Sequence, residues 1–148
     1  MPFHRIYAAP GLYSAKDKAD IAASLTSYYT SFGLPAFYVV VIFHDVDPAA
    51  DFYIGGVSQA ERERKTGKPF VRVVSQHLAL TMVGDRRPRG TDSLCAKFDP
   101  WIKDRGYEWE LHIEEPSRDL WRINGLEPPP FSSEAEAVWR LQDAGVPC

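Results

Sequence analysis

The chain has 148 residues, of which 45% are hydrophobic and 25% are charged, and its formal net charge at pH 7 is -3. This composition predicts one globular domain over residues 1–148 and excludes the basic excess that is typical of nucleic-acid-binding proteins. The two cysteines, Cys95 and Cys148, are far apart, and no long apolar stretch stands at the start. We therefore expect a cytoplasmic protein with neither nucleic acid nor a membrane as partner.

The first predicted element is a strand that begins at Pro2, in the run Pro-Phe-His-Arg-Ile-Tyr. A helix is predicted over residues 16–32, where apolar side chains recur at three- and four-residue spacings between a Ser14 N-cap and a stop at Gly33. The apolar, β-branched and aromatic run over residues 36–43 predicts a strand covered on both faces. These elements form a β-α-β half over about residues 2–45.

A second β-α-β half is predicted over about residues 69–115, because residues 69–74 repeat the Pro-Phe-x-Arg-aliphatic pattern of residues 2–7. It contains a strand over residues 70–79, a loop over 85–90, a helix over roughly 91–105 that Pro100 interrupts, and a strand over 107–114.

The connecting and terminal segments carry turn and cap signals. Between the halves, residues 51–57 predict a short strand that ends in a Gly-Gly turn, followed by a solvated charged run over residues 61–65. In the C-terminal tail, residues 116–148, Ser133 and Glu136 have the spacing of a capping box and predict a last helix through Leu141.

Three stretches, residues 33–41 (GLPAFYVVV), 52–56 (FYIGG) and 120–126 (LWRINGL), resemble the tautomerase superfamily when they are taken together with Pro2 and the two halves. The likeness is to the branch similar to cis-3-chloroacrylic acid dehalogenase, of the fungal oxalocrotonate tautomerase type, and it covers nearly the whole chain. It implies an α/β fold of the α+β kind, in which two tandem β-α-β units form a four-stranded mixed sheet with two helices on one face. It also implies a homotrimer with the amino-terminal proline at the floor of each pocket.

Pro2 can act chemically only if Met1 is removed, because its nitrogen then becomes a free secondary amine. An α-amino group has a pKa near ~8, and partial burial or nearby cations lower this pKa, which makes the amine a base near pH 7 and an acid once protonated. The alternative is that Pro2 merely shapes the first residues. Pro69 is internal, so its nitrogen is an amide and cannot act as a base.

This sequence replaces most of the side chains that surround the proline in the dehalogenase branch. The helix His of that branch falls here on Tyr29, and its two Arg fall near His77 and Leu80. Its closing-strand Tyr falls near Leu111, and its Glu falls at or near Arg122. Only Pro2 is clearly retained. Losing the paired Arg removes the bidentate hold on a carboxylate, so we do not expect chloroacrylate dehalogenation as the main activity.

The candidate site residues follow from this likeness. We expect Pro2, Tyr29 and His77 as catalytic residues, and Arg72, Trp121, Arg122 and Asn124 as substrate-binding residues. Each has a structural alternative: a strand-end hydrogen bond for His77, an ion pair or interface for Arg72, core packing for Trp121 and a turn for Asn124. Arg72 also lies five residues before His77, hence on the opposite face of an unbulged strand.

Other charged groups indicate less specific roles. Arg86, Arg87 and Arg89 form a small basic loop that is either solvated or attracts an anionic substrate. No metal is expected at His44 with its neighbouring aspartates, because no second His is near in sequence. His112 and its flanking glutamates alternate along one strand face as a polar edge or subunit contact.

These observations lead to a functional hypothesis: a cofactor-independent tautomerase or isomerase that uses Pro2 as general base or acid on a small 2-oxo or unsaturated carboxylic acid, or its enol. One alternative is a hydratase, dehalogenase or decarboxylase-type lyase in which protonated Pro2 is the acid. Another is a noncatalytic ligand-binding or structural trimer of the same fold.

Overall fold

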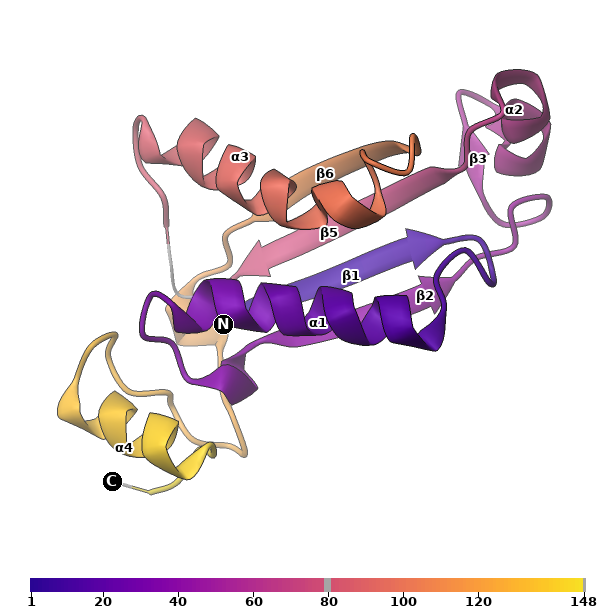
Figure 1. Cartoon of the computed structure of the whole chain (residues 1–148). Coiled ribbons are helices and arrows are strands. Elements are labelled where there is room, and N and C mark those ends of the chain that lie inside the picture. The colour runs from indigo at the N-terminus through magenta and orange to yellow at the C-terminus, as the bar shows by residue number, and fades with distance from the viewer. Residues whose placement is uncertain (79–80, 148) are drawn as a thin grey trace.

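A four-stranded mixed sheet with the strand order β2-β1-β5-β6 runs through the computed structural model, which describes residues 1–78 and 81–147 (Figure 1). The strands are β1 (Pro2–Ala8), β2 (Val40–Asp45), β5 (Phe70–His77) and β6 (Glu108–Glu114). β1 pairs parallel with β2, and β5 pairs parallel with β6, whereas β1 and β5 are antiparallel. Helices α1 (Ala15–Thr30) and α3 (Arg86–Phe98) cover one face of the sheet. The predicted fold class is confirmed.

The helix α1 begins where the sequence predicts. The Ser14 side chain accepts a hydrogen bond from the Asp17 backbone N–H, and the Asp17 carboxylate accepts one from the Ser14 backbone N–H, so the two form a complete capping box. Three apolar side chains on the inner face of α1 are buried against the sheet: Ile21, Leu25 and Tyr29.

The core lies between the sheet and the two helices. Alternate residues of the central strands point toward the helices, because side chains in a strand alternate between the faces. In β5 these residues are Val71, Val73 and Ser75, all fully buried. Residues Leu94 and Phe98 of α3 complete this core. No helix among the described residues covers the other face of the sheet, where Ile42 of β2 is 41% exposed.

Several predicted boundaries are wrong. The predicted loop over residues 85–90 is largely helical, because α3 begins at Arg86 and Pro88 lies in the first turn, where a missing N–H costs no hydrogen bond. Helix α3 ends at Phe98, and a short 3-10 turn containing Pro100 follows. The strand predicted from residue 36 begins at Val40, after a 3-10 turn over Ala36–Tyr38. β2 is also an edge strand and is not covered on both faces.

The predicted strand over residues 70–79 is observed as β5, and its last predicted residue, Ala79, lies outside the described residues together with Leu80. The predicted short strand at residues 51–57 is confirmed as β3 (Tyr53–Ile54), which forms a hairpin with β4 (Val57–Ser58). The connecting Gly55 and Gly56 have φ values of 61° and 82°, a conformation that favours glycine.

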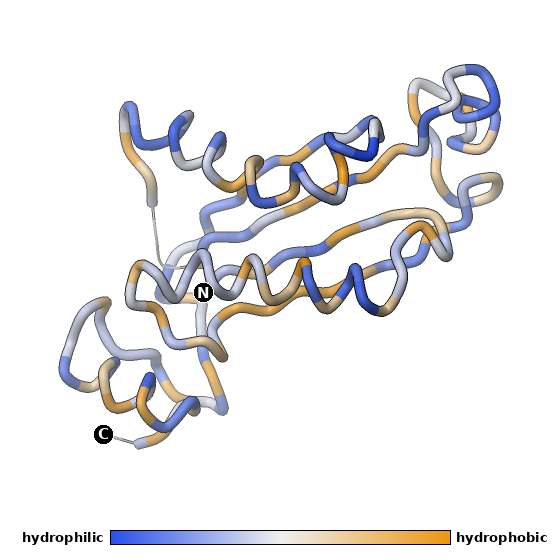
Figure 2. The backbone as a smooth tube through the Cα atoms, viewed as in Figure 1, coloured by the Kyte–Doolittle hydropathy of each residue, from blue (hydrophilic) through white to orange (hydrophobic). Residues whose placement is uncertain are grey.

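The two ends of the sheet carry different additions. The β3–β4 hairpin and α2 (Gln59–Thr66) lie at one end, and α2 is mostly hydrophilic (Figure 2). The C-terminal tail lies at the other end, near the start of β1, and includes α4 (Glu134–Gln142), whose predicted Ser133 cap is observed. The tail forms a second apolar cluster around Tyr38, Trp121 and Trp139. None of the helices in the described part of the chain is long and apolar enough to cross a membrane.

Candidate active site

A cavity of about 540 Å³ lies at the end of the sheet where β1 begins and β5 ends. Four parts of the chain form its walls: the strand ends, the last turns of α1, the first turns of α3 and the C-terminal tail. These segments are far apart in sequence and meet because the antiparallel pairing of β1 with β5 places Pro2 directly opposite His77.

The floor of the cavity contains the three predicted catalytic residues. Pro2 is buried at the start of β1, and the Tyr29 hydroxyl lies 2.8 Å from Nε2 of His77. Burial raises the pKa of Tyr29 above its usual range. Burial likewise lowers the pKa of His77, although the charge of Glu115 opposes this effect. Both side chains are therefore neutral near pH 7, and they share one hydrogen bond.

Met1 is present in the structure, so the nitrogen of Pro2 is an amide there. The Met1 amine donates a hydrogen bond to the Leu78 carbonyl oxygen at 2.6 Å. Burial lowers the pKa of this amine from 8.0 to about 5, Glu136 opposes the shift and Arg118 adds to it. This end of β1 is thus an environment in which an amine is uncharged at neutral pH.

His4 lies behind the floor, with none of its surface exposed. Its Nδ1 is 2.8 Å from the Ser75 hydroxyl, and its ring centroid is 5.4 Å from that of Tyr29. Burial lowers the pKa of His4 to about 3, and the charge of His77 adds to this shift. His4 is consequently uncharged near pH 7, like Tyr29 and His77 in front of it.

The C-terminal tail places a carboxylate in the wall of the cavity. Glu136 is 3% exposed, and its Oε2 accepts a hydrogen bond from the Ser132 backbone N–H at 2.7 Å. Arg118 also lines the cavity and donates to the Pro128 carbonyl oxygen. Burial raises the pKa of Tyr38 to about 12, Glu136 adds to the shift and Arg118 opposes it.

Three buried polar atoms of cavity-lining residues have no hydrogen bond within the described residues: Tyr38 Oη, His77 Nδ1 and Trp121 Nε1. Tyr38 and Trp121 are packed edge to face, with ring centroids 5.0 Å apart. A buried polar group without a partner costs about 1–3 kcal/mol, so such groups in a cavity are typical of a site that binds a polar ligand.

Helix α3 brings cationic side chains to the cavity. Arg86 and Arg89 line it, while Arg87 lies beside Glu115, with 3.9 Å between Nη2 and Oε2. The sequence left open whether this basic segment is solvated or attracts an anion. The structure places two of its three arginines at the cavity, because they belong to the first turns of a helix and not to a loop.

The structure brings together four of the seven predicted site residues, Pro2, Tyr29, His77 and Trp121. It does not bring the other three to this cavity. Arg72 lies on the opposite sheet face, as its spacing from His77 predicts, and pairs there with Glu110 and His112.

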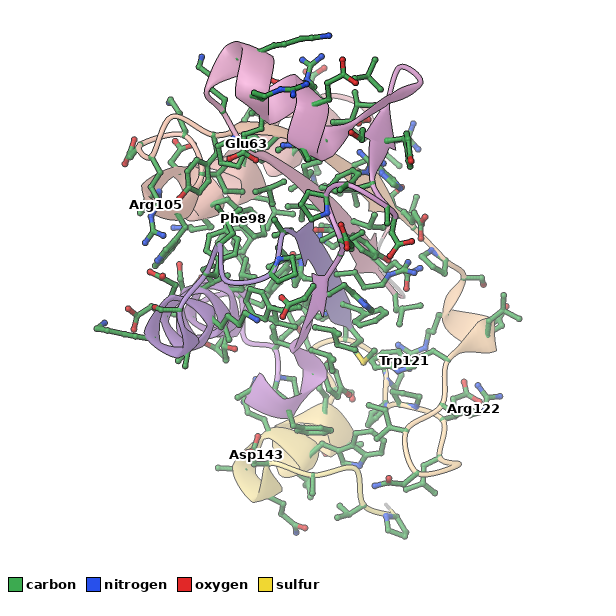
Figure 3. The ribbon with its side chains drawn as sticks, turned by 90° about the vertical axis from the view of Figure 1, so that its right-hand side faces the viewer. Glu63, Phe98, Arg105, Trp121, Arg122 and Asp143 are labelled. Atoms are coloured by element: carbon green, nitrogen blue, oxygen red, sulfur yellow. The ribbon has the colours of Figure 1, made fainter. Side chains whose placement is uncertain are left out.

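Arg122 and Asn124 are exposed in the tail. Arg122 donates to the Trp121 carbonyl oxygen at 2.7 Å and lies 3.7 Å from Glu127. Figure 3 shows Trp121 between the sheet and α4, and Arg122 on the outer loop of the tail. Asn124 has a φ of 52° in the turn that joins the bridged residues Ile123 and Leu126.

Sequence reasoning missed Tyr38, Arg118 and Glu136 as cavity residues. The sequence indicated Glu136 only as the capping-box partner of Ser133. In the structure its side chain accepts a hydrogen bond from the neighbouring Ser132 N–H. Nothing in the local sequence marks Arg118. Residues 1–78 and 81–147 contain no group of three or more His, Cys, Asp or Glu side chains that could hold a metal ion.

Solved structures share this architecture along the whole chain. RhCC from Rhodococcus jostii RHA1 is 33% identical, with a TM-score of 0.86 over 99% of each chain. A protein described as a probable enzyme from the thermophilic fungus Aspergillus fumigatus is 34% identical, with a TM-score of 0.83 over 100% of this chain and 98% of that chain. N1, a member of the cis-3-chloroacrylic acid dehalogenase family, is 16% identical, with a TM-score of 0.67 over 95% of this chain and 97% of that chain, and shares the fold alone.

No curated protein matches the chain significantly. The family model described as "Putative oxalocrotonate tautomerase enzyme" matches residues 1–144. A match over nearly the full length, together with the mixed sheet and the relatives above, shows that the chain belongs to this oxalocrotonate tautomerase-like family of the tautomerase superfamily.

Proposed function

We propose that the protein is a cofactor-independent tautomerase that uses the free amine of Pro2, after removal of Met1, as a general base and acid. Its substrate is a 2-oxo or unsaturated carboxylic acid, or the enol of one. The observation that carries the proposal is the position of Pro2 at the floor of the cavity, where burial lowers the pKa of the preceding amine to about 5. A neutral amine in such a site can take a proton near pH 7.

The reaction needs one proton to leave an enol oxygen and one to reach carbon. In the proposed mechanism, the Pro2 nitrogen removes the proton of the enol hydroxyl, the carbonyl forms, and the protonated amine returns a proton to the adjacent carbon. The unpartnered O–H of Tyr38 and N–H of Trp121 are the donors available to the negative oxygen that develops during transfer. Such donors stabilise a transition state when they are already in place.

The test is a titration of the Pro2 nitrogen by ¹⁵N NMR beside the pH profile of turnover. Mature protein, with intact mass showing the loss of Met1, is assayed with phenylenolpyruvate and 2-hydroxymuconate. We expect turnover whose acidic limb follows the titration of Pro2, at a pKa below the ordinary value near ~8. Retention of Met1 in protein from its native cell, or no turnover of either enol, would overturn the proposal.

A second candidate function is a hydratase-type lyase, because a buried carboxylate, Glu136, lines the same cavity. In this reaction protonated Pro2 gives its proton to one carbon of an unsaturated acid, while Glu136 takes a proton from the water that adds to the other carbon. Hydration of 2-oxo-3-pentynoate that disappears in a Glu136→Gln variant with intact enol turnover would support it. Recovery of the unchanged alkyne from the wild type would exclude hydration of this acid.

We further propose that the protein acts as a homotrimer through the sheet face that lacks helices. This face combines the exposed Ile42 with charged pairs such as Arg5 with Glu114 and Arg72 with Glu110, at 3.6 Å and 2.8 Å. Covering the exposed apolar side chain with another subunit favours self-association. Sedimentation equilibrium should give three times the chain mass, and a concentration-independent monomer would contradict the trimer.

A further inference from the structure

The cavity is much larger than a short acid requires, and its walls are mostly apolar and include several aromatic side chains. At about 540 Å³ it falls in the range of ~300–1,000 Å³ that is typical of pockets for drug-sized molecules. Tyr28 and Tyr29 from α1 and Trp121 from the tail form part of the wall. A three- or four-carbon acid would leave most of this apolar surface in contact with water, which is unfavourable.

Two phenylalanines at the cavity remain strongly exposed. Phe32, just after α1, is 58% exposed, and Phe131, in the tail, is 60% exposed, although both line the cavity. Large exposed apolar side chains beside a pocket are typical of a surface that a ligand covers. An aromatic ring fits them best, because aromatic side chains favour edge-to-face or offset contacts with another ring.

The charges at the cavity favour an anion. The described lining residues include three arginines, Arg86, Arg89 and Arg118, and one carboxylate, Glu136. Arg118 already donates to the Pro128 carbonyl oxygen, whereas Arg89 donates from its Nε to the Asp85 carbonyl oxygen, and its terminal nitrogens take no part in that contact. Arg86 and Arg89 are exposed to solvent, and an excess of positive charge beside a cleft attracts carboxylates.

We propose that this cavity takes aryl-substituted carboxylic acids in preference to short aliphatic ones, with the aryl group against Phe32 and Phe131 and the carboxylate at the arginines of α3. The inference rests on the proposed function, since it names the substrate class of the same site. The reacting carbon of such an acid lies at Pro2, between its carboxylate and its ring.

Binding of inert acids tests this selectivity without relying on turnover. The acids 3-phenylpropanoate and butanoate share a saturated chain and a carboxylate, but only the first has a ring, and neither can be tautomerised or hydrated. Calorimetry with the mature full-length chain should give a dissociation constant about thirtyfold lower for 3-phenylpropanoate, as burial of a phenyl group implies. Equal affinities, or no binding of 3-phenylpropanoate, would overturn the inference.

Variants at the two phenylalanines locate the ring. Phe131→Ala and Phe32→Ala should each weaken 3-phenylpropanoate binding about fivefold and leave butanoate binding within about twofold. Tyr53→Ala is the matched control, because Tyr53 is 59% exposed on β3 and does not line the cavity. A loss of affinity in Tyr53→Ala equal to that in the phenylalanine variants would contradict this placement.

Variants at arginines locate the carboxylate. Arg89→Gln should weaken both acids by about tenfold, because it removes a charged partner, whereas Arg64→Gln on α2 should change neither. Unchanged binding in Arg89→Gln and in Arg86→Gln would contradict the assignment. Selective binding without turnover of any enol would refute the proposed function and leave the aryl selectivity intact, whereas turnover without selective binding would refute only the aryl selectivity.

Discussion

A Pro-Phe pair stands at the start of β1 and again at residues 69–70, where β5 begins with Phe70. Because β1 and β5 run antiparallel, Pro2 and Pro69 mark opposite ends of one sheet. At the Pro2 end, the tail and the ends of α1 and α3 enclose the cavity of about 540 Å³. At the Pro69 end lies a smaller groove of about 270 Å³, lined in part by Tyr7 and Arg72.

The residues two positions after the two prolines differ in chemistry. His4 and Val71 occupy equivalent positions, and both are fully buried, but only His4 carries a group that can ionise. Arg62 of α2 donates two hydrogen bonds to Glu108 at the Pro69 end, which closes that end with an ion pair. The duplicated frame alone therefore does not make a site, because the C-terminal tail provides the wall that encloses one end.

The largest expected effect separates the two prolines. Pro2→Ala should lower kcat/KM for phenylenolpyruvate by about 100-fold, because it replaces the ring amine that performs the proton transfer. Pro69→Ala should leave kcat/KM within about twofold, since the Pro69 nitrogen is an amide. Steady-state assays of both variants check this, and a Pro2→Ala variant with full activity would refute Pro2 catalysis.

The next largest effect is expected on stability, at the buried histidine two positions after Pro2. The pKa of His4 is lowered to about 3, so between pH ~6.5 and pH ~3 the unfolded chain binds a proton at His4 that the native chain does not. The free energy of unfolding should therefore fall as pH falls, by about 2 kcal/mol for His4 between pH 7.5 and pH 5.

His4→Val makes the first half resemble the second, where Val71 stands, and should remove this part of the pH dependence. Urea unfolding of the wild type and of His4→Val at pH 7.5 and pH 5 measures the difference between their pH dependences. Both chains contain the same carboxylates, so the carboxylate contributions to the free energy of unfolding cancel in this difference. Equal pH slopes for wild type and His4→Val would mean that His4 titrates normally in the native protein.

A smaller effect is expected from the hydroxyl at the cavity floor. Tyr29→Phe removes the hydrogen bond to His77 and should lower kcat/KM about tenfold and the free energy of unfolding by about 1 kcal/mol. Tyr13→Phe is the matched control, because its hydroxyl bonds to the Trp101 carbonyl oxygen away from the cavity. Similar rate losses in both variants would show that the effect of Tyr29 is merely structural.

The smallest effect is expected at Arg72, which belongs to the other sheet face. Arg72→Gln should change kcat/KM by less than about twofold, since its partners are Glu110 and His112 and it does not line the cavity. The assay is run at a protein concentration at which size-exclusion chromatography gives equal sizes for variant and wild type. A tenfold loss under these conditions would place Arg72 in the site.

Local patterns in the sequence predicted much of the fold. The Ser14 and Ser133 caps and the apolar spacing before Gly33 are short-range features, and the structure shows both capped helices. The boundary errors arose where local signals conflict with packing. Pro88 and Gly90 are typical loop signals, yet they lie in α3, because Pro88 occupies the first turn and burial of Leu94 and Phe98 against the sheet stabilises the helix.

The sequence by itself determined the two β-α-β halves, the capped first and last helices and the presence of a proline that can become an amine, because these depend on neighbours along the chain. It did not indicate helix α2 in the charged run between the halves. Only the tertiary structure decided which side chains meet that proline. Residues such as Tyr29, Arg89 and Glu136 reach one cavity through strand pairing and the path of the tail, which no local pattern encodes. The lowered pKa values of His4 and His77 likewise come from burial, a property of the packed molecule.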